Sequence, residues 1–154
     1  MSMFGAAAIL YREDEVLIVK HGKESRHPTG LYSIPGGETK PSDRDTMDTI
    51  VREIREETGL EIDKANLDPL AHYDFDLGGK RGKRQVSVDL YACEVTDKIK
   101  TNVNLDEIRT ESFETIPVWV KIEDFILGKY TITYTSGNFL EDIIKYLKRK
   151  IREQ

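Results

Sequence analysis

One segment, Arg52–Leu60, constrains the fold of this chain more than any other, because it belongs to a helix with two different faces. At about 100° per residue, four apolar side chains fall in one stripe of that helix. They are Met47, Ile50, Val51 and Ile54. Such a stripe is typical of a helix that packs one face against a core, so the opposite face is left for solvent or for binding.

That opposite face carries three carboxylates, Glu53, Glu56 and Glu57. Like charges three or four residues apart repel by roughly 0.2–0.5 kcal/mol per pair, so a countercharge is expected. Arg52 lies one turn before Glu56 and can hold its carboxylate. Oxygen ligands without a nearby His or Cys suit Mg²⁺ or Mn²⁺ better than zinc. The alternative is an ordinary solvated face rich in Glu and Arg.

The ends of this helix also leave signals in the sequence. Ser42 or Asp43, after Pro41, is a candidate N-cap, and Asp45 three residues beyond Ser42 resembles a capping box. Gly59 is suited to a left-handed C-cap. We therefore predict a helix from about residue 42 to residue 58.

The same segment, together with the chain before it, resembles the signature of the Nudix hydrolase family. The second half of that signature is Arg-Glu-aliphatic-any-Glu-Glu-any-Gly-aliphatic, and residues 52–60 match every specified position. Residues 31–37, Leu-Tyr-Ser-Ile-Pro-Gly-Gly, resemble the strand and turn that lead into it, with Tyr32 where the family often has Trp.

The chain departs from the signature at one point. Counted forward from Gly37, the first Glu of the signature falls on Asp43; counted backward from Arg52, it falls on Arg44. One residue too many therefore lies between the two halves. The simplest interpretation is an insertion near the helix start, with Asp43 as a shorter acid at the expected position.

The resemblance implies Mg²⁺-dependent hydrolysis of the pyrophosphate bond in a nucleoside diphosphate linked to X, such as a nucleoside triphosphate, ADP-ribose or a nucleotide sugar. It implies that Glu53, Glu56 and Glu57 bind the metal, with Arg52 beside them. Glu53 and Glu57 are both candidates for the general base. The alternative is a Nudix-fold domain that binds a nucleotide as a sensor without cleaving it.

Further site residues are expected around this centre. The candidate substrate contacts are Gly36, Gly37, Tyr32 and Arg26. Tyr32 can stack on a ring. An additional acid can come from the segment before the last strand, where Glu111 and Glu114 are the candidates.

Composition restricts the class of protein. The 154 residues are 38% hydrophobic and 33% charged, which is typical of one globular domain spanning residues 1–154. A net charge of −5 argues against a nucleic-acid polymer or an anionic membrane as partner. Cys93 is the only cysteine, which favours a cytoplasmic protein without disulfides. A homodimer is left open.

The remaining patterns predict a mixed fold. Strands are predicted at residues 4–11, 16–20, 31–34, 70–77, 85–95 and 117–121, and a short helical turn at 122–127. Phe139, Ile143, Ile144 and Leu147 recur at helical spacing and predict a C-terminal amphipathic helix. Strands with two principal helices suit an α/β/α sandwich with a mixed sheet between helices, which the Nudix resemblance also implies.

Overall fold

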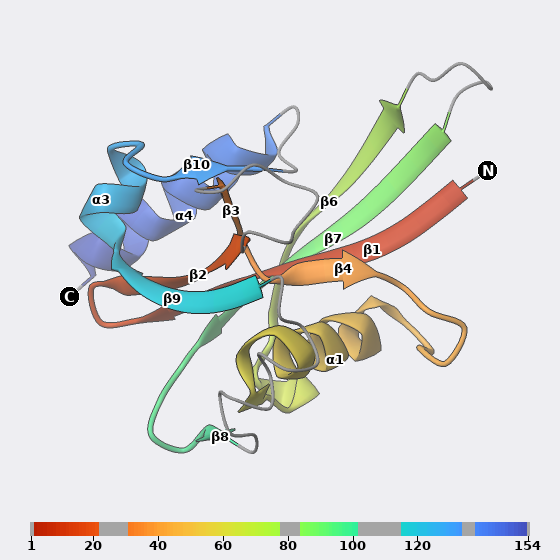
Figure 1. Cartoon of the computed structure of the whole chain (residues 1–154), viewed down its shortest axis with the longest axis horizontal. Coiled ribbons are helices and arrows are strands. Elements are labelled where there is room, and N and C mark those ends of the chain that lie inside the picture. The colour runs from red at the N-terminus through yellow and green to blue at the C-terminus, as the bar shows by residue number, and fades with distance from the viewer. Residues whose placement is uncertain (1, 22–30, 78–83, 102–114, 134–137, 154) are drawn as a thin grey trace.

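A twisted mixed sheet forms the centre of the protein in the computed structural model, with helices on both sides (Figure 1). The structure describes residues 2–21, 31–77, 84–101, 115–133 and 138–153. The elements are β1 (Ser2–Arg12), β2 (Glu15–His21), β3 (Leu31–Ser33), β4 (Gly36–Glu38), α1 (Thr46–Thr58), β5 (Leu60–Glu61), η1 (Lys64–Asn66), β6 (Asp68–Leu77), β7 (Arg84–Glu94), β8 (Lys100–Thr101), β9 (Thr115–Lys121), α3 (Ile122–Ile126), β10 (Thr131–Ile132) and α4 (Phe139–Arg152).

Strand β1 organises this sheet because it has three partners. Along one edge it runs parallel to β7, which in turn pairs with β6 in antiparallel fashion. Its other edge is divided between two antiparallel strands. Gly5–Ala7 pairs with β4, and Leu10–Arg12 pairs with β2, which continues the sheet to β3, β10 and β9. The site described below is built where β4 leaves this divided edge.

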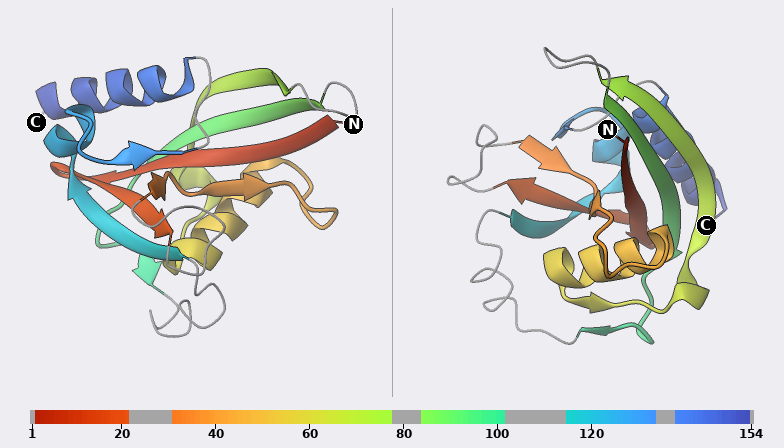
Figure 2. Two further views of the ribbon diagram at one scale, coloured as in Figure 1. Left: turned by 45° about the horizontal axis from the view of Figure 1, so that its top comes forward. Right: turned by 90° about the vertical axis from the view of Figure 1, so that its right-hand side faces the viewer.

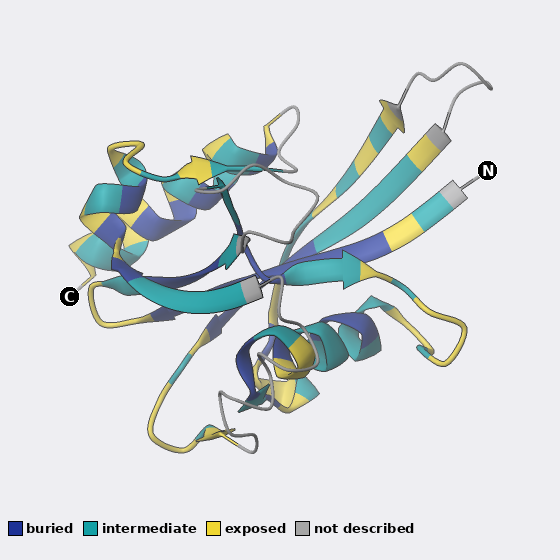
Figure 3. Ribbon diagram, in the orientation of Figure 1, coloured by how far each residue is buried: buried dark blue, intermediate teal, exposed yellow. Residues whose placement is uncertain are grey.

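Alternation along β1 divides the core into two layers. Ala7, Ile9 and Tyr11 belong to the layer that contains α3 and α4, whereas the even-numbered residues from Ala6 to Leu10 belong to the layer that contains α1. Figure 2 shows α1 and α4 on opposite sides of β1 and β7. Buried residues are concentrated on β1, β2 and the inward faces of these helices (Figure 3). The predicted α/β/α sandwich with a mixed sheet is confirmed.

Helix α1 packs as its apolar stripe predicts, but it begins later than predicted. Ile50 and Ile54 are fully buried, and Met47 and Val51 pack beside them. The N-cap is Asp45, whose carboxylate accepts a hydrogen bond from the Asp48 N–H at 2.8 Å. The predicted start at residue 42 is therefore wrong, because residues 39–45 form a loop that absorbs the extra residue. The predicted C-cap is confirmed, since Gly59 has φ of 77°.

The Pro35-Gly36-Gly37 segment was predicted as a turn. In the structure its two glycines also begin strand β4. Gly36 pairs with Ala7 and Gly37 with Ala6. The predicted longer strands and the helical turn of α3 are present within one or two residues of their predicted bounds. The pairs β5–β8 and β3–β10 were not predicted, because a two-residue strand has too short a sequence pattern to be recognised.

The C-terminal amphipathic helix is confirmed as α4. Its residues Phe139, Ile143 and Leu147 are buried against the sheet, with Ile144 partly buried beside them. None of the helices in the described part of the chain has the length and hydropathy needed to cross a bilayer.

Candidate active site

The site lies where β4 passes between β1 and α1, and two glycines allow this close passage. A Cβ atom at Gly36 would lie 2.5 Å from the carbonyl oxygen of Ala6, which belongs to fixed strand backbone. A Cβ at Gly37 would lie 2.4 Å from the carboxyl carbon of Glu53. The two glycines therefore bring the backbone of β4 against β1 on one side and against the acidic face of α1 on the other.

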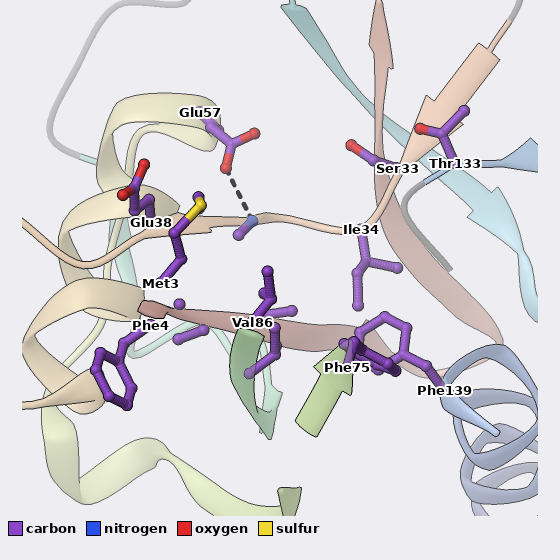
Figure 4. A pocket seen from close by; sticks show the side chains of 16 residues that line it. Met3, Phe4, Ser33, Ile34, Glu38, Glu57, Phe75, Val86, Thr133 and Phe139 are labelled. Atoms are coloured by element: carbon purple, nitrogen blue, oxygen red, sulfur yellow. Dashed lines mark hydrogen bonds between the residues drawn. The ribbon is translucent and has the colours of Figure 1, made fainter. Parts of the chain in front are cut away.

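Glu57 reaches across this interface to the backbone of β4. Its Oε1 accepts a hydrogen bond from the Gly36 N–H at 2.9 Å (Figure 4). The residue keeps some exposed surface, but its carboxylate is surrounded by protein atoms. This burial raises the pKa of Glu57 to about 8, against the opposing effect of the Gly36 N–H, and the charges of Glu53 and Glu56 add to the rise.

Arg52 joins the other two glutamates of the helix. Its guanidinium donates to Glu53 at 3.0 Å and to Glu56 at 3.3 Å, and also to the carbonyl oxygen of Glu38 at 3.1 Å. The predicted contact between Arg52 and Glu56 is thus present. Burial raises the pKa of Glu53, and Arg52 partly offsets that rise. Arg52 holds two carboxylates in place but makes no ion pair with Glu57 among the described residues.

The side chain of Asp43, in the loop before α1, is buried against the Arg52 guanidinium. Its two oxygens accept from Arg52 at 2.8 and 3.2 Å, and it also accepts from the Lys40 N–H and the Thr49 hydroxyl. These hydrogen bonds, led by the one from Arg52, hold its pKa well below the usual range. The Arg44 side chain is 85% exposed and pairs with Asp48. Of the two ways to count the signature, the forward count thus identifies the acid that contacts Arg52.

A cavity of about 540 Å³ opens beside Glu57. Figure 4 shows Glu38, Glu57 and Ser33 on one side of the β3–β4 chain, and apolar side chains on the other. The apolar lining is contributed mainly by β1, β6, β7 and α4, through Met3, Phe4, Phe75, Val86, Val88 and Phe139. The sequence pattern did not identify any of these residues as cavity residues; Phe139 was predicted only as part of the apolar face of the C-terminal helix.

Comparison with known families agrees with this geometry. The family model described as NUDIX domain matches residues 1–143. The chain is a member of the Nudix family. The predicted resemblance and the predicted enzyme class, Nudix pyrophosphohydrolase, are confirmed at the level of the family. A comparison with curated protein sequences found no significant match.

Solved structures share the Nudix fold at low sequence identity. The Nudix domain of Shewanella oneidensis NrtR, solved with ADP ribose, superposes with a TM-score of 0.66 at 17% identity, covering 97% of this chain and 89% of that one. The Bacillus subtilis pyrophosphohydrolase BsRppH superposes with a TM-score of 0.64 at 21% identity, covering 95% of this chain and 81% of that one. The MutT protein of Methanosarcina mazei Go1 superposes with a TM-score of 0.60 at 22% identity, covering 97% of this chain and 94% of that one.

Nudix hydrolases generally use a divalent metal, and the donor set of this chain fits a hard cation. The described residues contain no group of three or more His, Cys, Asp or Glu side chains already gathered to metal-binding distance. Glu53, Glu56 and Glu57 nevertheless lie on one helix face and supply only oxygen donors, and Glu53 and Glu56 share the Arg52 guanidinium. The buried Glu57 carboxylate in particular lacks a countercharge among the described residues, and a cation would supply it.

The other predicted site residues fall into two groups. Tyr32 packs its ring edge-on against Tyr130, with centroids 5.2 Å apart, and does not line the cavity, whereas Gly36 and Gly37 do. Arg26, Glu111 and Glu114 lie outside the described residues.

The raised pKa of Glu57 predicts a pH-dependent stability of the metal-free Nudix domain. The native state holds a proton on Glu57 up to about pH 8, whereas an unfolded Glu loses it near pH 4.5. The native state thus binds more protons over this interval, so the free energy of unfolding should fall as pH rises through it. Urea unfolding at several pH values with a chelator present measures this slope. Glu57→Gln should flatten it; an unchanged slope in that variant would contradict the assignment.

Proposed function

We propose that this single-domain Nudix protein is a Mg²⁺- or Mn²⁺-dependent hydrolase of the pyrophosphate bond in a nucleoside diphosphate linked to X, and that it releases a nucleoside monophosphate. The observation that carries the proposal is the position of Glu57. Its carboxylate belongs to the acidic face of α1 and also lines the apolar cavity. A cation held by the helix would therefore lie beside the group that the cavity holds.

The carboxylates and Arg52 have separable roles in this reaction. Glu53, Glu56 and Glu57 would hold the cation, while Arg52 fixes the first two of them. When bound, a divalent cation neutralises phosphate charge and lowers the pKa of a coordinated water. Glu57 or Glu53 would accept the proton from the attacking water, as a positioned carboxylate can.

The bonds exchanged are those of an ordinary hydrolysis. The water oxygen bonds to one phosphorus as the bond from that phosphorus to the bridging oxygen breaks. One water proton goes to the carboxylate and the other remains on the new phosphate. One phosphate leaves with the nucleoside and the other with X.

The cavity suits the uncharged ring of such a substrate. Its volume of about 540 Å³ lies within the range typical of small-molecule sites. No Lys, Arg or His lines it among the described residues, so it offers no countercharge to a phosphate. We therefore place the ring among Phe75, Phe139 and Val86, and the phosphates at the Glu57 edge. The net charge of −5 is consistent with a small nucleotide bound through a cation, in a cytoplasmic protein, and not with a nucleic-acid polymer.

A substrate panel tests the proposal. Purified protein is incubated with nucleoside triphosphates, ADP-ribose, dinucleoside polyphosphates and nucleotide sugars, with Mg²⁺, Mn²⁺ or EDTA, and released nucleoside monophosphate is measured by chromatography. We expect release from at least one compound with either metal and none with EDTA. Tight binding of a nucleotide without release from any compound would overturn hydrolysis in favour of a nucleotide sensor.

A further inference from the structure

Two aromatic rings from different elements form part of the cavity wall, on the side where we place the ring of the substrate (Figure 4). Phe75 lies on β6, and its position is fixed by the pairing of that strand with β7, where it lies opposite Val86. Phe139 is the first residue of α4. The N-cap of this helix, Asn138, makes no side-chain hydrogen bond to the first turn, so the position of Phe139 depends on what else holds that turn.

Tyr73 contacts this turn from behind the wall. It lies two residues before Phe75 on the same face of β6, and it is not itself one of the lining residues. Its ring stacks parallel to that of Phe75 with the centroids 6.0 Å apart, and it packs edge-on against Phe139 at 5.2 Å. Its hydroxyl donates to the Asp142 carboxylate at 2.5 Å. Phe139 and Asp142 lie three residues apart and therefore on one side of the helix, so Tyr73 contacts the first turn of α4 at two points.

The hydrogen bond between Tyr73 and Asp142 has the properties of a lasting contact. Burial raises the pKa of Tyr73, and the hydrogen bond to Asp142 raises it further, so the hydroxyl stays protonated and donates throughout the neutral range. Asp142 is fixed in turn, because its backbone N–H donates to the carbonyl oxygen of Asn138 at 2.9 Å. A hydrogen bond to a charged acceptor is stronger than one between neutral groups. The separation of β6 and α4 beside the cavity is therefore determined at this contact.

We propose that Tyr73 is a positioning residue for the substrate: through its hydrogen bond to Asp142 it fixes the Phe139 ring beside β6, and it thereby sets the affinity of the cavity for the ring of the bound nucleotide. The inference rests on the proposed function only in taking the ligand to be a nucleotide whose ring enters the cavity. The carboxylates that would hold the cation lie on α1, on the opposite side of β1 and β7 from α4 (Figure 2). Loss of the Tyr73 hydroxyl should therefore weaken binding of the ring and leave the chemical step unchanged.

The test compares Tyr73→Phe with the parent protein, because this substitution keeps the aromatic contacts and removes only the hydroxyl. Binding of the four nucleoside monophosphates is measured by calorimetry in Mg²⁺. We expect the affinity for the monophosphate that the parent binds best to fall by about 3- to 10-fold. In steady-state kinetics on the best substrate of the panel, KM should rise by a similar factor while kcat changes by less than about twofold.

Asp142→Ala removes the acceptor of the same hydrogen bond and completes a double-mutant cycle. It should weaken binding of the monophosphate as Tyr73→Phe does. The double variant should lose less affinity than the product of the two single losses, because both substitutions break one contact. Single losses that multiply in the double variant would show that the two groups act independently and would overturn the proposal.

Tyr146→Phe is the matched control. The Tyr146 hydroxyl also joins α4 to the sheet, since it donates to the Tyr11 hydroxyl at 3.4 Å, but neither of these residues lines the cavity. This variant should keep the affinity for the monophosphate even where it lowers the Tm. Equal losses of affinity in Tyr146→Phe and Tyr73→Phe, or an unchanged affinity in Tyr73→Phe, would overturn the proposal, as would a parent protein that binds none of the monophosphates. If the parent binds a monophosphate but hydrolyses nothing, the proposed hydrolysis fails while the role of Tyr73 is still decided by the binding data.

Discussion

Glu57→Gln should lower kcat by about 10³-fold while the protein remains folded. The substitution keeps the shape of the side chain and its ability to accept the Gly36 N–H. It removes the negative charge that would hold the cation and one of the two candidates for the proton acceptor. Both losses act on the chemical step, so kcat should fall much more than the affinity for the nucleotide. Steady-state kinetics on the best substrate of the panel measures the effect.

Two comparisons make the Glu57 result specific. Glu141→Gln removes an exposed carboxylate on α4 that pairs with Lys145, far from the site, and should leave kcat within about twofold. Metal titration of Glu57→Gln, followed by the Tm, should show weaker stabilisation by Mg²⁺ than in the parent. Turnover within a few fold of the parent would show that Glu57 neither holds the cation nor accepts the proton.

Arg52→Ala should lower kcat by about 10²-fold and should also lower the Tm, unlike Glu57→Gln. The guanidinium contacts Asp43, Glu53 and Glu56 at once. Without it, the Asp43 side chain, which is 5% exposed, keeps its charge but loses its cationic partner, and the two glutamates repel each other without a fixed geometry. Arg52→Lys should recover part of the stability but little of the activity, because an ammonium cannot replace the planar fork that binds several carboxylates.

Arg44→Ala is the control for Arg52, because Arg44 lies at the position that the backward count of the signature assigns to an acid. Its exposed side chain makes one surface ion pair with Asp48. Its removal should change the free energy of unfolding by no more than about 0.5 kcal/mol and leave kcat unaltered. Thermal unfolding and steady-state kinetics of Arg44→Ala and Arg52→Ala test this expectation. A larger loss in Arg44→Ala than in Arg52→Ala would show that the loop before α1 adopts the other register.

The local features of this fold could be predicted from the sequence because they depend on neighbouring residues. The apolar stripe through Ile50 and Ile54, the cap at Gly59 and the contact of Arg52 with Glu56 all follow from helical spacing. The helix start could not, since Ser42, Asp43 and Asp45 are all residue types that cap helices; the structure uses Asp45, while the Asp43 carboxylate accepts from Arg52 instead.

Features that depend on tertiary contacts were beyond the sequence pattern. Phe75 on β6 and Phe139 on α4 are separated by 64 positions, and nothing local indicates that they line one cavity with Glu57. A strand face that alternates aromatic residues has the same pattern whether it packs in a core or borders a cavity.

The narrow passage of β4 has a consequence for redesigning this protein toward other substrates. The Gly36 peptide is fixed on one side by its pairing with Ala7 and on the other by Glu57, so one layer of backbone lies between β1 and the acidic face of α1. Enlarging side chains on the β1 wall would displace that layer and misalign the carboxylate with it. New specificity should therefore be engineered from the opposite wall, at Phe75, Val86 and Phe139, where the volume can be changed while the reaction geometry is preserved.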